Sequence, residues 1–222
     1  MFNAAFSAGG ALIVLAVTST VLPVQAIVPI HSTLLIGSTM SRVLMFRDHV
    51  DWSLVVPFWV GALGGALLGA RIYVELPETI IATAISIIML IAIWLPRISW
   101  RPRIRHPWAI VGFFHSLLST LFAYGALLHA VILHTDLRRR QIVATLGGSL
   151  LGMSVFKISG YAYFGFDYRP YLGMIGAAVA ISFAGTAIGK RIVDRLPEKG
   201  FRLIFQLLIT VTALRLLYTG LR

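Results

Sequence analysis

The sequence predicts an all-α integral membrane protein made of two homologous halves that are inverted relative to each other. Three observations predict this fold: the chain is too apolar for a soluble domain, its apolar segments have the length of membrane helices, and one motif occurs twice. Of 222 residues, 58% are hydrophobic and 12% are charged, whereas a soluble domain has about 25% charged residues. Since the residues that would face water are missing, the outer surface is expected to face lipid.

Eight apolar segments account for nearly the whole chain. A spanning helix needs about 20 apolar residues, and such a run must satisfy its own backbone hydrogen bonds, which favours helices. The weak alternation of an outer-membrane β-barrel is absent. Most breaks between the segments carry a proline, a charge or both. The expected elements lie at residues 2–22, 25–45, 53–73, 79–95, 108–133, 140–162, 170–189 and 201–219.

A motif near the end of the third segment recurs near the end of the seventh. The pattern Gly-x3-Gly-x-Arg-x4-Leu-Pro-Glu occupies residues 65–78 and again residues 185–198, a shift of 120. Earlier positions match at a shift of 116, as Ser38 does with Ser154. We therefore predict a first membrane repeat at 1–96, a basic linker at 97–106 and a second membrane repeat at 107–222.

The charged loops favour inverted halves. The linker has four arginines and no acidic residue, and residues 136–140 hold three arginines against one aspartate, so the positive-inside rule places both in the cytoplasm. One full crossing between them would put them on opposite sides. A re-entrant segment 108–133, broken near Tyr124-Gly125, keeps both inside. By the repeat, segment 2–22 is expected to break near Gly9-Gly10, which gives six spanning helices and two broken elements. Eight plain transmembrane helices are the alternative.

The two expected breaks provide a candidate anion site. A half-helix N-terminus exposes unpaired N–H groups and the positive end of its dipole, and glycine lets a ligand approach the backbone. Secondary transporters often combine inverted repeats with broken helices that meet at the midplane. The alternatives are close helix packing for the glycines, which we favour for Gly61 and Gly65, and back-bonding to the i−4 carbonyl for the hydroxyls. The candidate substrate-binding residues are Ser7, Gly9, Gly10, Thr33, Tyr124, Gly125, Ala126 and Ser149.

Four further side chains within apolar segments carry or can take a charge. Arg42 and Lys157 each lie toward the end of a segment, where they would snorkel to the interface or neutralise an anionic substrate. His115 and His129 would be hydrogen-bonded structural residues or take part in proton coupling. No Asp or Glu lies inside the expected segments, so carboxylate proton relays and carboxylate sodium sites are not expected.

The motifs of several enzyme and cofactor classes are absent. The sequence has no Walker motif, Rossmann fingerprint, catalytic triad or HExxH, and it has no cysteine. The net charge of +11 would indicate nucleic acid in a soluble protein, but here the cations lie in short loops between apolar segments. We expect no enzyme activity, no cofactor, no metal and no nucleic-acid partner. The expected partners are a small anionic solute and the lipid bilayer, and the sequence leaves homo-oligomerisation open.

Over nearly its whole length the chain resembles the sulfite exporter TauE/SafE family of membrane permeases. The resemblance rests on the Gly-rich break in each half (residues 7–10 and 124–126), the small-polar second helix after residues 22–26, residues 47–52 before the third helix, and the twice-repeated Gly-x-Arg-x4-Leu-Pro-Glu. It implies a secondary transporter that moves a small organic or sulfur-containing anion, such as sulfite or a sulfonate, across the bacterial inner membrane. A non-transporting scaffold or assembly subunit is the alternative.

Overall fold

The computed structural model describes residues 2–94, 108–132, 135–181 and 198–220, and these residues form helices joined by short turns, with no strand among them. Three helices are long and apolar enough to cross a membrane. They are α2 (Val24–Phe46), which continues into η1 (Arg47–His49), α3 (Trp52–Glu75) and α7 (Arg139–Tyr163). The prediction of an all-α membrane protein agrees with this part of the chain.

The remaining helices contain shorter apolar stretches. They are α1 (Phe2–Val21), α4 (Glu78–Trp94), α5 (Trp108–Phe122), α6 (Ala126–Ile132), η2 (Arg169–Tyr171), an unlabelled helix at residues 172–181, and α9 (Glu198–Gly220). Where the structure describes them, these bounds agree with the predicted segments to within a few residues. The linker 97–106 and nearly all of the second copy of the motif, residues 185–197, lie outside the described residues.

Glycines bring the backbone of α5 directly against that of α3. A Cβ added at Gly61 would lie 1.8 Å from the carbonyl oxygen of Ala109, and one at Gly65 would lie 2.1 Å from that of Phe113. A Cβ added at Gly112 would lie 2.1 Å from the carbonyl oxygen of Phe58. The packing interpretation of Gly61 and Gly65 is confirmed. Since the contacting residues advance together along both helices, α3 and α5 run parallel.

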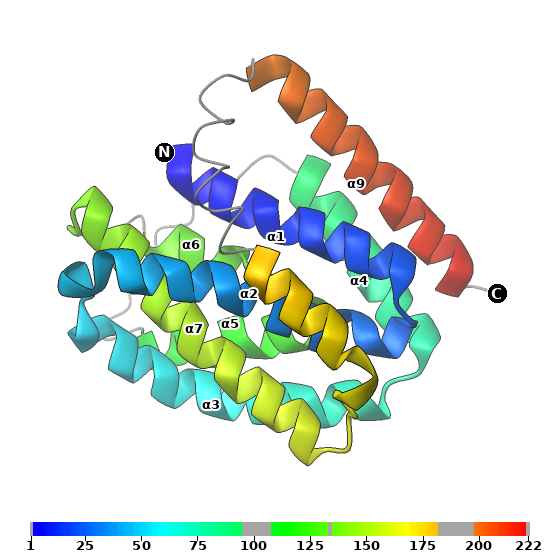
Figure 1. Cartoon of the computed structure of the whole chain (residues 1–222), viewed down its shortest axis with the longest axis horizontal. Helices are drawn as coiled ribbons and strands as arrows, with labels where there is room; N and C mark the ends of the chain where they lie inside the picture. The colour runs from blue at the N-terminus through cyan, green and yellow to red at the C-terminus, as the bar shows by residue number, and fades with distance from the viewer. Residues whose placement is uncertain (1, 95–107, 133–134, 182–197, 221–222) are drawn as a thin grey trace.

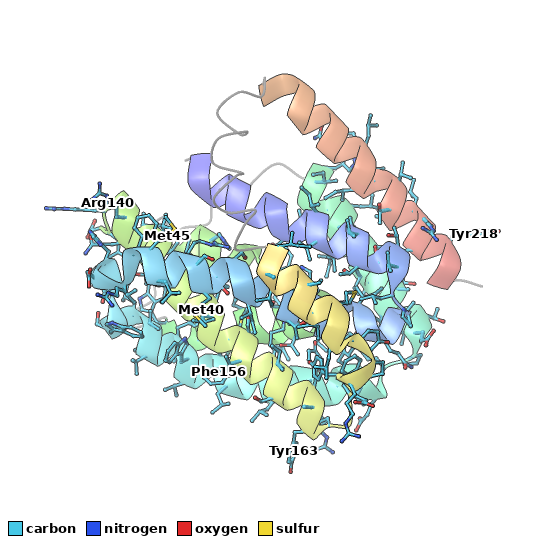
Figure 2. The ribbon with its side chains drawn as sticks, viewed as in Figure 1. Met40, Met45, Arg140, Phe156, Tyr163 and Tyr218 are labelled. Carbon is cyan, nitrogen blue, oxygen red and sulfur yellow. The ribbon has the colours of Figure 1, made fainter. Side chains whose placement is uncertain are left out.

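Two pairs of helices that the repeat assigns to corresponding positions pack against each other, and the first pair is α2 with α7. Arg42 and Val43, late in α2, lie against Gly147, early in α7. Figure 2 accordingly shows Met45 and Arg140 at the same end of the molecule. The two helices are therefore antiparallel, as the ribbon also shows (Figure 1).

The second pair is α4 with α9, and it is antiparallel too (Figure 1). Trp94 at the end of α4 donates its indole N–H to Thr210 Oγ1 at 2.9 Å. Glu78 at the start of α4 instead lies with Arg215, later in α9, around a hollow of about 290 Å³. Both corresponding pairs thus run in opposite directions.

The first element differs from its prediction, because α1 is continuous from Phe2 to Val21. The expected break near Gly9-Gly10 is therefore wrong for this structure. A glycine within a helix costs only about 1 kcal/mol relative to alanine. A break in apolar surroundings leaves several N–H and C=O groups without partners, and each unsatisfied group costs several kcal/mol in hydrocarbon. Two adjacent glycines alone do not outweigh that cost.

The second expected break is present, between Phe122 at the end of α5 and Ala126 at the start of α6. Ala123 has a φ of 56°, a left-handed conformation that a helix of L-residues cannot continue through. After the break the chain turns back, since the amide of Leu128 donates to His115 Nδ1 at 3.1 Å. Residues 108–132 are therefore a helical hairpin and not one plain helix.

Both ends of this hairpin point to the end of the molecule where α7 begins. The amide of Asp51, at the start of α3, donates to Thr145 Oγ1, near the start of α7, at 3.0 Å. Because α5 runs parallel to α3, it also begins toward this end, and α6 returns to it. The chain therefore turns back at the break, as the predicted re-entrant path requires.

Candidate functional site

Side chains of α7 bond carbonyl groups in the last turn of α5, just before the break. Lys157 Nζ donates to the carbonyl oxygen of Ser119 at 2.8 Å and to its Oγ at 3.1 Å. The hydroxyl of Tyr161 donates to the carbonyl oxygen of Thr120. The carbonyl of Ser119 also accepts the amide of Ala123 at 3.0 Å, so the ammonium adds a second bond there, whereas the carbonyl of Thr120 is among those that a helix end leaves without a backbone partner. A cation at a helix C-terminus also interacts favourably with the helix dipole. α7 therefore stabilises the break.

Lys157 does not snorkel to the interface, as one sequence interpretation predicted. Its side chain is 2% exposed, and its ammonium is directed at the end of α5 across the helix interface. The correction has a physical reason, because the ammonium finds carbonyl partners inside the protein and does not need the interface to be solvated.

Three histidines around the hairpin each bond a backbone group through one ring nitrogen. His31 Nε2–H donates to the carbonyl oxygen of Ala11 at 3.0 Å, and His129 Nδ1–H donates to that of Gly125 at 2.8 Å. His115 Nδ1 accepts the N–H of Leu128. The second ring nitrogen of each histidine is buried and has no hydrogen-bond partner among the described residues.

These backbone bonds fix the neutral tautomer of each ring. Since His115 Nδ1 accepts a hydrogen bond, its unpartnered Nε2 carries the proton and is a donor. In His31 and His129 it is the protonated nitrogen that is hydrogen-bonded, because a carbonyl group can only accept. Their unpartnered nitrogens, His31 Nδ1 and His129 Nε2, therefore hold a free lone pair. His115 lies near enough to both His129 and Lys157 to interact with them electrostatically.

Four buried hydroxyls are also without a partner among the described residues. Two belong to the helices at the hairpin, Ser116 on α5 and Ser149 on α7, and the other two are Thr83 on α4 and Tyr168 in the turn before η2. Ser149 lies one helical turn before Met153, so both occupy one face of α7. Met153 packs in the same apolar cluster as Leu128 of α6, so this face of α7 is directed at the hairpin. Sequence reasoning proposed Ser149 but missed Ser116 and His31, although each is a polar residue within an apolar segment, which is itself a signal of function.

Thr33 and Arg42 on α2 already have partners. The hydroxyl of Thr33 donates to the carbonyl oxygen of Ile30 at 2.7 Å, which is the kind of local back-bonding that competes with a ligand role. Arg42 Nε donates to the carbonyl oxygen of Ser38 at 3.1 Å. Its guanidinium therefore turns back along α2, and it lies near enough to His129 to interact electrostatically.

The predicted residues at the break lie in open surroundings. A Cβ added at Gly125 would meet no heavy atom within 4 Å, so helix packing does not account for this glycine. Tyr124 is half-buried beside it, and Ala126 begins α6. In the first half, Ser7, Gly9 and Gly10 lie within the unbroken α1, where their amides belong to a helix.

Two hollows among the described residues contain no predicted site residue. One, of about 250 Å³, lies between Gln25, Tyr73 and the turn around Phe166, and the other lies by Glu78 and Arg215. Within the described part of the chain, no group of three or more His, Cys, Asp or Glu side chains could hold a metal ion.

Comparison with known proteins supports the sequence resemblance. No curated protein and no solved structure matches the chain. A family model described as Sulfite exporter TauE/SafE matches residues 1–216. Membership of this family implies a membrane transporter of sulfite or related anions. Because the match extends over nearly all of the 222 residues, the chain belongs to the sulfite exporter TauE/SafE family.

Proposed function

We propose that the chain is a secondary transporter that moves a small organic or sulfur-containing anion, such as sulfite or a sulfonate, across the bacterial inner membrane. The observation that carries this proposal is the set of buried, unpartnered polar groups on the helices around one broken element. A buried donor without a partner costs about 1–3 kcal/mol, and such groups in native proteins call for an explanation such as function. An oxyanion would supply the missing acceptors.

In the proposed site, His115 Nε2–H, the hydroxyl of Ser116 and the hydroxyl of Ser149 donate to the anion. Lys157 and Arg42 add positive potential, although their nearest hydrogen-bond partners are protein atoms. Tyr124, Gly125 and Ala126 form the wall at the break, where the open space beside Gly125 leaves room for a ligand. Thr33 would donate to the anion only if its hydroxyl gives up its hydrogen bond to the carbonyl of Ile30.

The first half would contribute a wall of small residues. α1 contacts α6, and Ser7, Gly9 and Gly10 are small residues of α1. Since the amides of Gly9 and Gly10 belong to a continuous helix, they are not donors in this conformation. The proposed site is therefore asymmetric, with its hydrogen-bond donors in the second half.

The antiparallel packing of α2 with α7 and of α4 with α9 supports inverted repeats at 1–96 and 107–222. A two-fold axis in the membrane plane reverses a helix and makes corresponding helices antiparallel, whereas an axis along the membrane normal leaves them parallel. Transporters with inverted repeats work by alternating access, in which one bundle rocks against another around a fixed site.

The proposal is tested by transport and binding in the purified protein. Sulfite, small sulfonates and small carboxylates are first compared for thermal stabilisation, because a ligand of the native state raises its apparent stability. Gly125→Leu is then compared with wild type for anion uptake into proteoliposomes. We expect Gly125→Leu to insert and unfold as wild type does, since its site is open, but to lose uptake.

Gly173→Leu is the matched control, because a Cβ there also meets nothing within 4 Å and residue 173 is exposed on another helix. This variant should transport normally. Normal uptake by Gly125→Leu would contradict the proposed site. If wild type neither binds nor transports any of these anions, the scaffold alternative is favoured.

A further inference from the structure

The three histidines around the hairpin differ in whether they can accept a proton. His115 Nδ1 already accepts the amide hydrogen of Leu128, so protonation there would cost the bond that holds the start of α6. His129 is different, because its Nδ1–H donates to Gly125 and its Nε2 lone pair is free. A proton added at Nε2 leaves the bond to Gly125 intact.

His31 also has a free lone pair, at Nδ1, but its position differs. The residue is 3% exposed and lies between α1 and α2. It interacts electrostatically with Lys157, but its hydrogen bond is to α1 and not to the break. The bond of His129 to Gly125 ties its ring directly to the break, although its Nε2 is buried as well. Of the two, His129 combines a free lone pair with a direct bond to the proposed anion site.

We propose that His129 is the proton-binding site of an anion–proton symporter, an inference that rests on the proposed function. A proton from water adds to the Nε2 lone pair while an anion occupies the site, and both leave on the other side of the membrane. No other bond forms or breaks. With one proton for each monovalent anion, the carried charges cancel.

The charged and titratable groups around His129 connect proton binding to anion binding. Arg42 of α2 and His115 of α5 lie near enough to it to interact electrostatically, while Lys157 of α7 lies near His115 and α1 has no titratable side chain. Protonation of His129 adds a positive charge that Arg42 repels, and a bound anion offsets this repulsion. Anion and proton therefore favour each other's binding, and this linkage is reciprocal.

The test measures anion exchange and proton movement separately in proteoliposomes that contain a trapped pH dye. Methanesulfonate is the first probe, because it keeps one fixed negative charge and releases no proton itself, and sulfite is the second. Counterflow without a pH gradient reports anion transport alone. A gradient of one pH unit should drive about tenfold accumulation by wild type, since one unit is a factor of ten in proton activity.

His129→Asn keeps an amide N–H at the position of Nδ1 and removes the titrating nitrogen. We expect this variant to retain counterflow but to lose anion-driven proton uptake and gradient-driven accumulation. His49→Asn, in η1 outside the site, is the matched control and should behave as wild type. His31→Gln, which keeps a donor at the position of Nε2, should also remain coupled.

Accumulation by His129→Asn as large as that of wild type would overturn the inference, and so would uncoupling by His31→Gln alone. Wild-type counterflow without proton movement would also overturn it while leaving the proposed function in place. Absence of wild-type counterflow with both probes would instead contradict the proposed function. If His129→Asn does not fold, His129→Gln is measured in the same way.

Discussion

The repeat assigns α1 and the α5–α6 hairpin to corresponding positions, yet only the second is broken. Both contain glycine at the expected break, so glycine does not account for the difference. The neighbouring helices do differ. Lys157 and Tyr161 of α7 bond carbonyl groups in the last turn of α5, whereas the corresponding positions of α2, at the shift of 116, are Ser41 and Met45.

Neither of those α2 residues can take over the same role. The hydroxyl of Ser41 donates to the carbonyl of Gly37 in its own helix at 2.8 Å, and Met45 has no donor and is 64% exposed. Glycine thus permits a break, and in this chain the break occurs where a neighbouring helix supplies side-chain donors to the last turn before it.

The largest effect is expected from Lys157→Met, which removes the donor and keeps much of the side-chain volume. Because hydrogen bonds to charged groups contribute about 1.5–3 kcal/mol, we expect the free energy of unfolding to fall by roughly that amount and anion counterflow to be lost. Unfolding in detergent and counterflow measure the two effects. Arg140→Met, at an exposed cation near the start of the same helix, should change neither. Wild-type stability of Lys157→Met would show that the break does not depend on α7.

An intermediate effect of opposite sign is expected in α1. Since both positions are helical, Gly9→Ala combined with Gly10→Ala should raise the free energy of unfolding by about 1 kcal/mol for each residue, and counterflow should continue. Thermal unfolding and counterflow of the double variant provide the check. A stabilised variant that no longer transports would instead mean that α1 must open at these glycines during transport, and the two halves would then be alike in function.

The smallest effect is expected from Tyr161→Phe, which removes one neutral hydrogen bond to the carbonyl of Thr120. The ring keeps its edge contact with Tyr73, whose centroid lies 5.4 Å away, so the loss should be about 1 kcal/mol. Unfolding of the single and double variants with Lys157→Met measures whether the two residues act together. Tyr163→Phe, which is 80% exposed, should lie within about 0.5 kcal/mol of wild type. If Tyr161→Phe lowers the free energy of unfolding as much as Lys157→Met does, the hydroxyl of Tyr161 is the main stabilising group at the break.

Local patterns predicted the helix bounds and the hairpin. Proline and charge mark the ends of the apolar runs, and a chain that turns back near Gly125 resolves the conflict between the charges of the linker and those of residues 136–140. The continuity of α1 and the burial of Lys157 were not predictable in this way. Both depend on which side chain of one helix reaches the end of another, a contact between residues almost forty positions apart in the case of Ser119 and Lys157.

The glycine contact between α3 and α5 determines which parts of the molecule can shift independently. With Gly61, Gly65 and Gly112 at the crossing, no layer of side chains is available to slide or rearrange between the two backbones. α3 belongs to the first predicted half and α5 to the second, so the two helices form one rigid unit with a helix from each half. The bodies that move against each other during transport are therefore not simply residues 1–96 and residues 107–222.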